Sequence, residues 1–241
     1  MNLELIVVFL AALLAGGVAS VSGFGIGSLL TPLLASRVDL QLAVAAVSIP
    51  HLLGTAVRFI LIRKDLRKDI FVSFGIWSAF GGLAGALLHN IAKDPILVIV
   101  FAFLLIFAGT TSALGLSEKM RFSPRLSWLA GLISGGFGGL VGNQGGIRAA
   151  ALLGFDLTKQ EFVATATGIA LLVDAARMPV YFATLSSSLL PLWLPIAVAS
   201  FGVLLGTFFG KLALQKIPDT TFKRTVAVII LVLGLSMLFK Y

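Results

Sequence analysis

The feature that most restricts the fold of this chain is a succession of apolar runs, several of them long enough to cross a lipid bilayer. A membrane-spanning helix needs about 20 mostly apolar residues. The 241 residues are 59% hydrophobic and 12% charged, and the mean hydropathy is +1.07. We expect helices at residues 3–20, 26–36, 40–62, 70–88, 95–114, 127–138, 146–155, 159–183, 190–214 and 222–239. The sequence therefore predicts an all-α, polytopic integral membrane protein surrounded by membrane lipids.

A glycine-rich segment interrupts the apolar pattern in the second half, with the sequence Gly138-Gly-Leu-Val-Gly-Asn-Gln-Gly-Gly-Ile-Arg148. Glycine at this density breaks a helix, because it loses the most backbone entropy on ordering. The freed backbone groups are tolerated in a bilayer only where they are buried in protein or line a polar cavity. A looser counterpart, Ser22-Gly-Phe-Gly-Ile-Gly-Ser28, lies near the N-terminus. Two glycine-broken apolar hairpins at corresponding places indicate a transporter binding site.

The two halves of the chain share several positions in the same order. Three pairs are 117 residues apart and a glycine pair recurs after 121 residues: Gly25 and Gly142, Asp39 and Asp156, Ser48 and Thr165, then Gly81-x-x-x-Gly85 and Gly202-x-x-x-Gly206. Matches in this order favour an internal duplication, with repeats at residues 1–116 and 125–241. The glycine pairs also predict close helix packing.

Lysine and arginine positions distinguish two topologies. If each broken segment crosses the membrane once, the basic loop residues divide eight against seven between the two sides, which is no bias. If each segment is a re-entrant hairpin, one side holds twelve: Arg63, Lys64, Arg67, Lys68, Lys119, Arg121, Arg125, Lys159, Lys211, Lys216, Lys223 and Arg224. The other side then holds Arg37, Lys93 and Lys240, in agreement with the positive-inside rule.

We therefore predict two inverted structural repeats, each built from a re-entrant hairpin and three transmembrane helices. The loop at 63–69 would be cytoplasmic, and the loop at 184–189 and both termini would be external. The run at 3–20 is long for half a hairpin, which leaves a tilted near-span open. We expect a multi-pass protein of the cell (cytoplasmic or inner) membrane, and a homodimer is one assembly that the sequence allows.

Composition argues against several other classes of protein. The net charge of +8 could indicate a nucleic-acid partner, but the basic residues lie at helix ends, where topology explains them, so we expect none. The absence of cysteine excludes disulfides and thiolate metal sites, and we expect neither a metal nor a cofactor. Residues 1–19 carry Glu4 and lack a positive first segment, so we interpret them as mature structure and not as a signal peptide.

Arg148 is the leading candidate for binding substrate. It follows the glycine break, in the first turn of a short helix whose N-terminus favours anions. The alternative is a structural arginine that donates to loop carbonyls. Asn143 and Gln144 could bind a polar substrate or cap this helix, and Gly145 and Gly146 allow its backbone to approach closely.

The first break and the helices that follow both breaks supply further candidates. Gly25 and Gly27 could approach a substrate, or serve only in turns and helix crossings. Ser48, Thr165 and Thr167 are hydroxyl residues on the long spans, and could line the site or donate to the preceding helical turn.

Two ionisable residues could couple transport to protons. Asp174 is the one acid well inside an apolar run, although Arg177 is three residues away on the same helix face and can neutralise it. His51 could relay protons, or be buried as a neutral hydrogen-bonded ring. Arg58 lies one turn from the end of its span, and we expect its side chain to reach the membrane surface.

The second break, together with Asp156-Leu157 and Thr165-Ala-Thr167, resembles the sulfite exporter TauE/SafE family, also called the toluene sulfonate uptake permease family. The resemblance covers nearly the whole chain, and Gly23-Phe-Gly-Ile-Gly27 with Pro32 is a looser version of the first-half motif. It implies secondary transport of a small sulfur-containing or organic anion such as sulfite, sulfoacetate or thiosulfate.

The predicted function is therefore secondary transport of a small anion by alternating access, in which the two inverted halves rock around the anion, with a proton gradient as the driver. An anion channel and a non-transporting membrane assembly subunit are the alternatives. We do not expect an enzyme. A catalytic triad would need a serine nucleophile together with His51 and Asp174, and no serine in the sequence lies in a nucleophile-elbow motif.

Overall fold

The computed structural model describes residues 3–89, 94–116, 126–142, 145–152, 155, 157–214, 228, 231, 232, 235 and 238. Regular structure in these residues is entirely helical: α1 (Leu3–Ser22), α2 (Ile26–Ala35), α3 (Leu40–Ile62), η1 (Arg63–Asp65), α4 (Lys68–His89), α5 (Asp94–Ala113), α6 (Ser127–Val141), α7 (Gly145–Leu152), α8 (Lys159–Leu189), η4 (Leu190–Leu192) and α9 (Trp193–Leu214). The expected all-α fold is confirmed. The boundary between the two expected repeats, and most of the expected helix at 222–239, lie outside the described residues.

Within the described part of the chain, four helical stretches are long and apolar enough to cross a membrane: Leu3–Val21, Leu40–Asp65, Lys68–His89 and Gln160–Gly210. The fourth joins α8 and α9. At about 1.5 Å per residue, α1 is about 30 Å long, which matches the apolar thickness of a bilayer. The shorter α6, α2 and α7 have 15, 10 and 8 residues.

Helix α8 corrects one expectation from the sequence. The run at 184–189 was expected to be a loop, but it is helical and belongs to α8. Its polar side chains do not end the helix, because the hydroxyl of Thr184 donates to the carbonyl oxygen of Val180 one turn earlier, at 2.8 Å. The chain leaves the α8 direction at η4, which contains Pro191.

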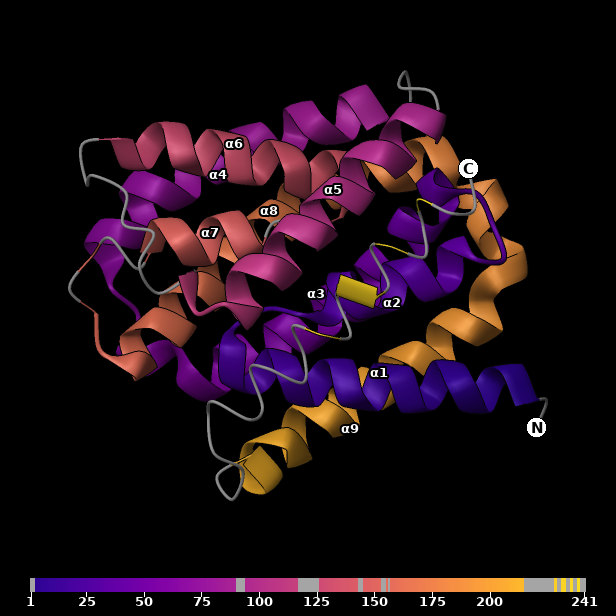
Figure 1. Cartoon of the computed structure of the whole chain (residues 1–241), viewed down its shortest axis with the longest axis horizontal. Helices are drawn as coiled ribbons and strands as arrows, with labels where there is room; N and C mark the ends of the chain where they lie inside the picture. The colour runs from indigo at the N-terminus through magenta and orange to yellow at the C-terminus, as the bar shows by residue number, and fades with distance from the viewer. Residues whose placement is uncertain are drawn as a thin grey trace.

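The helices are arranged around two pairs that pack through glycine. Helix α4 lies beside α6 at one edge of the molecule, α1 crosses α9 at the opposite edge, and α2, α3, α7 and α8 lie between them (Figure 1). A Cβ on Gly81 or Gly85 would overlap a backbone carbonyl oxygen of α6, and a Cβ on Gly202 or Gly206 one of α1. The predicted glycine packing faces are confirmed.

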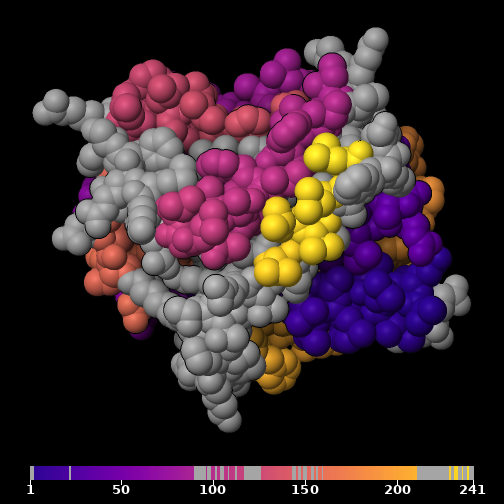
Figure 2. All heavy atoms as spheres, viewed as in Figure 1, coloured from indigo at the N-terminus to yellow at the C-terminus, as the bar shows by residue number. Residues whose placement is uncertain are grey.

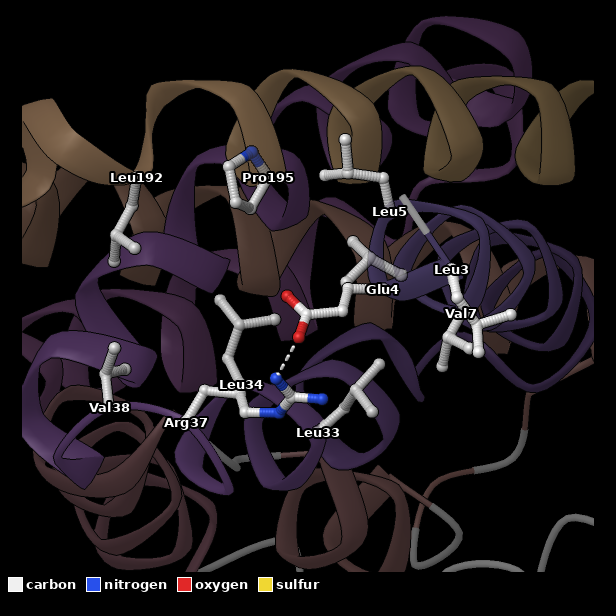
Figure 3. Close-up of a pocket in the computed structure, with 11 residues that line it drawn as sticks. Leu3, Glu4, Leu5, Val7, Leu33, Leu34, Arg37, Val38, Leu192 and Pro195 are labelled. Atoms are coloured by element: carbon white, nitrogen blue, oxygen red, sulfur yellow. Dashed lines mark hydrogen bonds and ion pairs between the residues drawn. The ribbon is translucent and has the colours of Figure 1, made fainter. Parts of the chain in front are cut away.

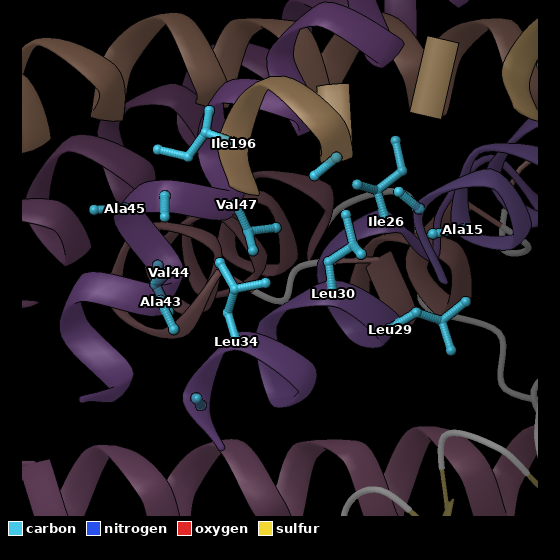
Figure 4. Packing of buried hydrophobic residues seen from close by; sticks show 14 of the residues in the cluster. Ala15, Ile26, Leu29, Leu30, Leu34, Ala43, Val44, Ala45, Val47 and Ile196 are labelled. Carbon is cyan, nitrogen blue, oxygen red and sulfur yellow. The ribbon is translucent and has the colours of Figure 1, made fainter. Parts of the chain in front are cut away.

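The apolar core lies around α2, the short helix that follows the first glycine break. In Figure 4, Ile26, Leu30 and Leu34 of α2 pack with Val47 of α3 and Ile196 of α9. The burial of this ten-residue helix fixes the first break in the interior.

The outer surface is apolar, as a protein surrounded by lipid requires. Helix α5, drawn in magenta, lies across the face shown in Figure 2 and exposes Ile96, Ile99, Phe103 and Phe107. With the spans described above, this surface identifies a multi-pass membrane protein.

Candidate functional site

The two glycine-rich breaks meet inside the molecule. A Cβ on Gly27 of α2 would lie too close to the carbonyl oxygen of Gly142, and a Cβ on Gly145 would overlap the side chain of Phe24. Gly25 and Gly142 have φ values of 133° and 73°, which favour glycine. At Gly27 and Gly145 the close neighbour is therefore the other break, whereas a Cβ on Gly25 would overlap the side chain of Val18 in α1.

Each break also lies against the long helix of the other half. A Cβ on Gly23 would contact Ala166 of α8 at 3.5 Å, and a Cβ on Gly142 would lie 3.1 Å from Val44 of α3. Helices α3 and α8 also pack against each other. The breaks and the two long helices therefore form one buried centre.

Arg148 projects from α7 into this centre. Its side chain is 2% exposed, and its Nε and Nη1 atoms are buried with no hydrogen-bond partner among the described residues. Buried N–H groups without a partner are costly, so they indicate a position for an acceptor. Gly146 lies beside Gly145 in α7, and Asn143 and Gln144 lie outside the described residues.

The location of Arg58 differs from the one expected from the sequence. Its side chain does not reach the membrane surface but is 3% exposed, with Nε donating to Thr167 Oγ1 at 2.9 Å and Nη2 to the carbonyl oxygen of Gly23 at 3.4 Å. These acceptors lie on α8 and the first break, so they draw the guanidinium inward. Its Nη1 atom is buried without a partner among the described residues.

Arg58 belongs to a polar stripe along α3. The spacing of the polar residues in the sequence was sufficient to predict this stripe. Ser48, His51, Thr55 and Arg58 follow the 3.6-residue helical period, and all four are buried on one face of α3. The facing helix α8 buries Thr167, Asp174, Arg177 and Tyr181 with a similar period. A polar stripe in a membrane helix is expected to face the protein interior.

Asp174 joins the two stripes. Its Oδ2 lies 2.6 Å from Nδ1 of His51, and its Oδ1 accepts from Nε and Nη2 of Arg177 at 3.0 and 2.7 Å. Arg177 also donates from Nη1 to the carbonyl oxygen of Gly138 at 2.7 Å. The pairing expected for Asp174 and Arg177 is present, and the histidine adds a second partner from the other half of the chain.

The hydrogen-bond network continues to the far end of α4. Tyr181 donates its hydroxyl to the carbonyl oxygen of Gly139, and its ring lies 5.2 Å from the ring of His89. The His89 ring nitrogens lie 2.6 and 3.1 Å from the carbonyl oxygens of Leu140 and Gln41. These contacts connect the ends of α3, α4 and α6 to the centre.

The remaining hydroxyl candidates have other partners. Ser48 donates to the carbonyl oxygen of Ala45 at 2.6 Å and lies 2.9 Å from Sδ of Met178. Thr165 accepts from the backbone N–H of Arg67 at 3.1 Å. Of the three predicted hydroxyls, the structure brings Thr167 into contact with a buried arginine.

The charges of this centre do not balance. The described residues bury three arginines and one acid, Asp174, which pairs with Arg177. Arg58 and Arg148 repel each other electrostatically, and Asp174 attracts both. An arginine at the centre of a bilayer costs about 2.5–3.5 kcal/mol on insertion scales, so two arginines without their own acid favour a bound anion.

A separate cavity of about 300 Å³ lies at the surface between the beginning of α1 and the end of α2 (Figure 3). Its walls are mostly apolar, and the Glu4–Arg37 ion pair, at 2.5 Å, crosses it. Both charged side chains are about two-thirds exposed. This cavity contains none of the residues of the buried centre, and its one cation is already paired.

No cluster of three His, Cys, Asp or Glu side chains suited to a metal ion occurs among the described residues. The donors that converge on the centre are guanidinium groups, which bind anions and not cations.

Comparison with known protein families gives one match. The model of the family described as Sulfite exporter TauE/SafE matches residues 8–237. Comparisons with curated proteins and with solved structures gave no match.

Proposed function

The chain belongs to the sulfite exporter TauE/SafE family, and we propose that it is a secondary transporter that moves a small sulfur-containing or organic anion across the cytoplasmic membrane. Family membership supports anion transport of this general kind. The buried centre supports it independently, because its excess of positive charge lies where two interrupted apolar segments meet.

The observation that carries the proposal is the environment of Arg148. Its guanidinium is buried beside the second break, and two of its nitrogens have no partner in the described part of the chain. A guanidinium offers forked donors that match the oxygens of a sulfite, sulfonate or carboxylate group. An anion at this position would satisfy both the hydrogen bonds and the charge.

Alternating access is the mechanism that the packing supports. The helix that precedes the first break, α1, packs on α9, and the helix that precedes the second break, α6, packs on α4. Each of these helices therefore contacts a long helix of the other half of the chain. The same glycine spacing is used in both contacts. Two halves related in this way, as inverted repeats with re-entrant hairpins, would rock against each other around the buried anion.

The pairing of His51 with Asp174 supports coupling of transport to protons. A proton bound by this pair adds one positive charge near the two arginines, and thereby strengthens their attraction for an anion. Binding of the anion must strengthen binding of the proton by the same factor. The proposed transporter is therefore a symporter, which carries proton and anion together.

Transport into proteoliposomes tests this proposal. Purified protein in liposomes should accumulate sulfite, thiosulfate or sulfoacetate with saturable kinetics. Uptake should be faster when the external solution, from which the anion is taken up, is acidic. Arg148→Ala should abolish uptake, whereas Arg37→Ala should retain it, because Arg37 is exposed and outside the centre. Flux without saturation would indicate a channel, and flux no greater than in protein-free liposomes would refute transport of these anions.

A further inference from the structure

Arg58 and Arg148 reach the centre from different halves of the chain. Arg58 is on α3 and Arg148 is on α7, and their side chains are 3% and 2% exposed. Together they present three buried guanidinium nitrogens without a partner among the described residues: Nη1 of Arg58, and Nε and Nη1 of Arg148.

The charge of the described centre fixes how much negative charge it can accept. Asp174 pairs with Arg177 through two hydrogen bonds, so this pair contributes no net charge. With His51 neutral, Arg58 and Arg148 leave an excess of two positive charges. A ligand with one negative charge would compensate only one of them in a site shielded from water.

We propose that Arg58 binds the substrate together with Arg148, and that the two make the site selective for an oxyanion with two negative charges. This proposal rests on the proposed transport function and specifies its substrate class. A tetrahedral or pyramidal oxyanion has several oxygens, so it can accept from two guanidinium groups at once.

Arg58 is held in place for this role by two contacts. Thr167 accepts from its Nε on the side of α8, and the carbonyl oxygen of Gly23 accepts from its Nη2 on the side of the first break. The remaining nitrogen, Nη1, is left for a ligand. The arginine therefore connects both halves of the chain to the substrate, so its removal should change selectivity as well as affinity.

The test compares two anions of the same shape and different charge. Sulfate and methanesulfonate are both tetrahedral, but sulfate is a dianion and methanesulfonate a monoanion. Their dissociation constants, with those of thiosulfate, would be measured by titration calorimetry on the full chain in detergent. We expect the wild type to bind the two dianions at least about tenfold more tightly than methanesulfonate.

Variants at Arg58 separate charge from geometry. Arg58→Gln should bring the dianion and monoanion affinities to within about threefold of each other, while Arg58→Lys should retain part of the preference because the charge remains. Arg37→Gln, an exposed arginine paired with Glu4, should leave the wild-type ratio unchanged.

The outcomes distinguish this proposal from the transport proposal. Equal affinities for sulfate and methanesulfonate in the wild type would overturn the dianion selectivity, even if Arg58→Gln failed to fold. A wild-type ratio that persists in Arg58→Gln would overturn the role of Arg58 alone. Absence of binding for sulfate, methanesulfonate and thiosulfate, and for sulfite and sulfoacetate titrated in the same way, would overturn both proposals.

Discussion

Replacing Asp174 with asparagine tests the charge balance of the buried centre most directly. The side chain of Asp174 is fully buried and accepts from His51 and twice from Arg177. Asparagine keeps the size but removes the negative charge, and it leaves Arg177 uncompensated next to two further buried arginines. Breaking a buried ion pair by removing one partner typically costs about 3–5 kcal/mol.

An exposed ion pair in the same protein provides the control. Glu4 and Arg37 lie 2.5 Å apart, but their side chains are 64% and 65% exposed. Surface pairs of this kind contribute about 0–1 kcal/mol. Glu4→Gln should therefore lower the free energy of unfolding by less than about 1 kcal/mol, against about 3 kcal/mol or more for Asp174→Asn.

Equilibrium unfolding in mixed micelles, followed by circular dichroism, would measure both variants. We expect thiosulfate to restore more stability to Asp174→Asn than to the wild type, because the variant has a larger excess of positive charge and ligands stabilise the state that binds them. If Asp174→Asn costs no more than Glu4→Gln, the centre is not desolvated as the structure indicates. That result would refute the claim that the centre holds an excess of positive charge shielded from water.

Three further predictions concern packing, positioning and coupling. Gly81→Ala should prevent the close contact of α4 with α6 and greatly reduce the yield of folded protein, while Gly136→Ala, whose Cβ would meet only an atom 3.9 Å away, should fold; size-exclusion chromatography separates these outcomes. Thr167→Val removes an acceptor of a buried guanidinium and should weaken thiosulfate binding about tenfold, whereas Thr165→Val should change it little; calorimetry on both variants would contradict the positioning role if they behaved alike. His51→Gln should retain anion binding but lose the acceleration of uptake by an acidic solution, and acceleration equal to that of the wild type in proteoliposomes would exclude this histidine as the proton carrier.

The helices were predictable because their cause is local. Apolar runs and glycine breaks placed α3 at the expected residues 40–62 and α2 within one residue of the expected 26–36. The exception is the end of α8, where a polar run at 184–189 resembled a loop. The hydroxyl of Thr184 satisfies a carbonyl oxygen of the preceding turn, so local composition did not determine the backbone there.

The centre was harder to predict because its contacts are not local. His51 and Asp174 are 123 residues apart in the chain, and no spacing rule brings them together. The inward direction of Arg58 depends on acceptors in α8 and the first break, so proximity to the end of a helix was misleading. The period shared by Ser48, His51, Thr55 and Arg58 was the available signal.

The two predicted repeats differ in where they place charge. By the 117-residue spacing, Arg148 of α7 corresponds to Thr31 of α2. Thr31 is also buried, and its Oγ1 lacks a partner in the described part of the chain, but it is neutral. With His51 neutral, a second arginine there would raise the excess from two to three positive charges, one more than a dianion compensates. A hydroxyl at this position keeps the charge matched to the proposed substrate, and the corresponding positions of the proposed repeats still place a polar group on each side of the centre.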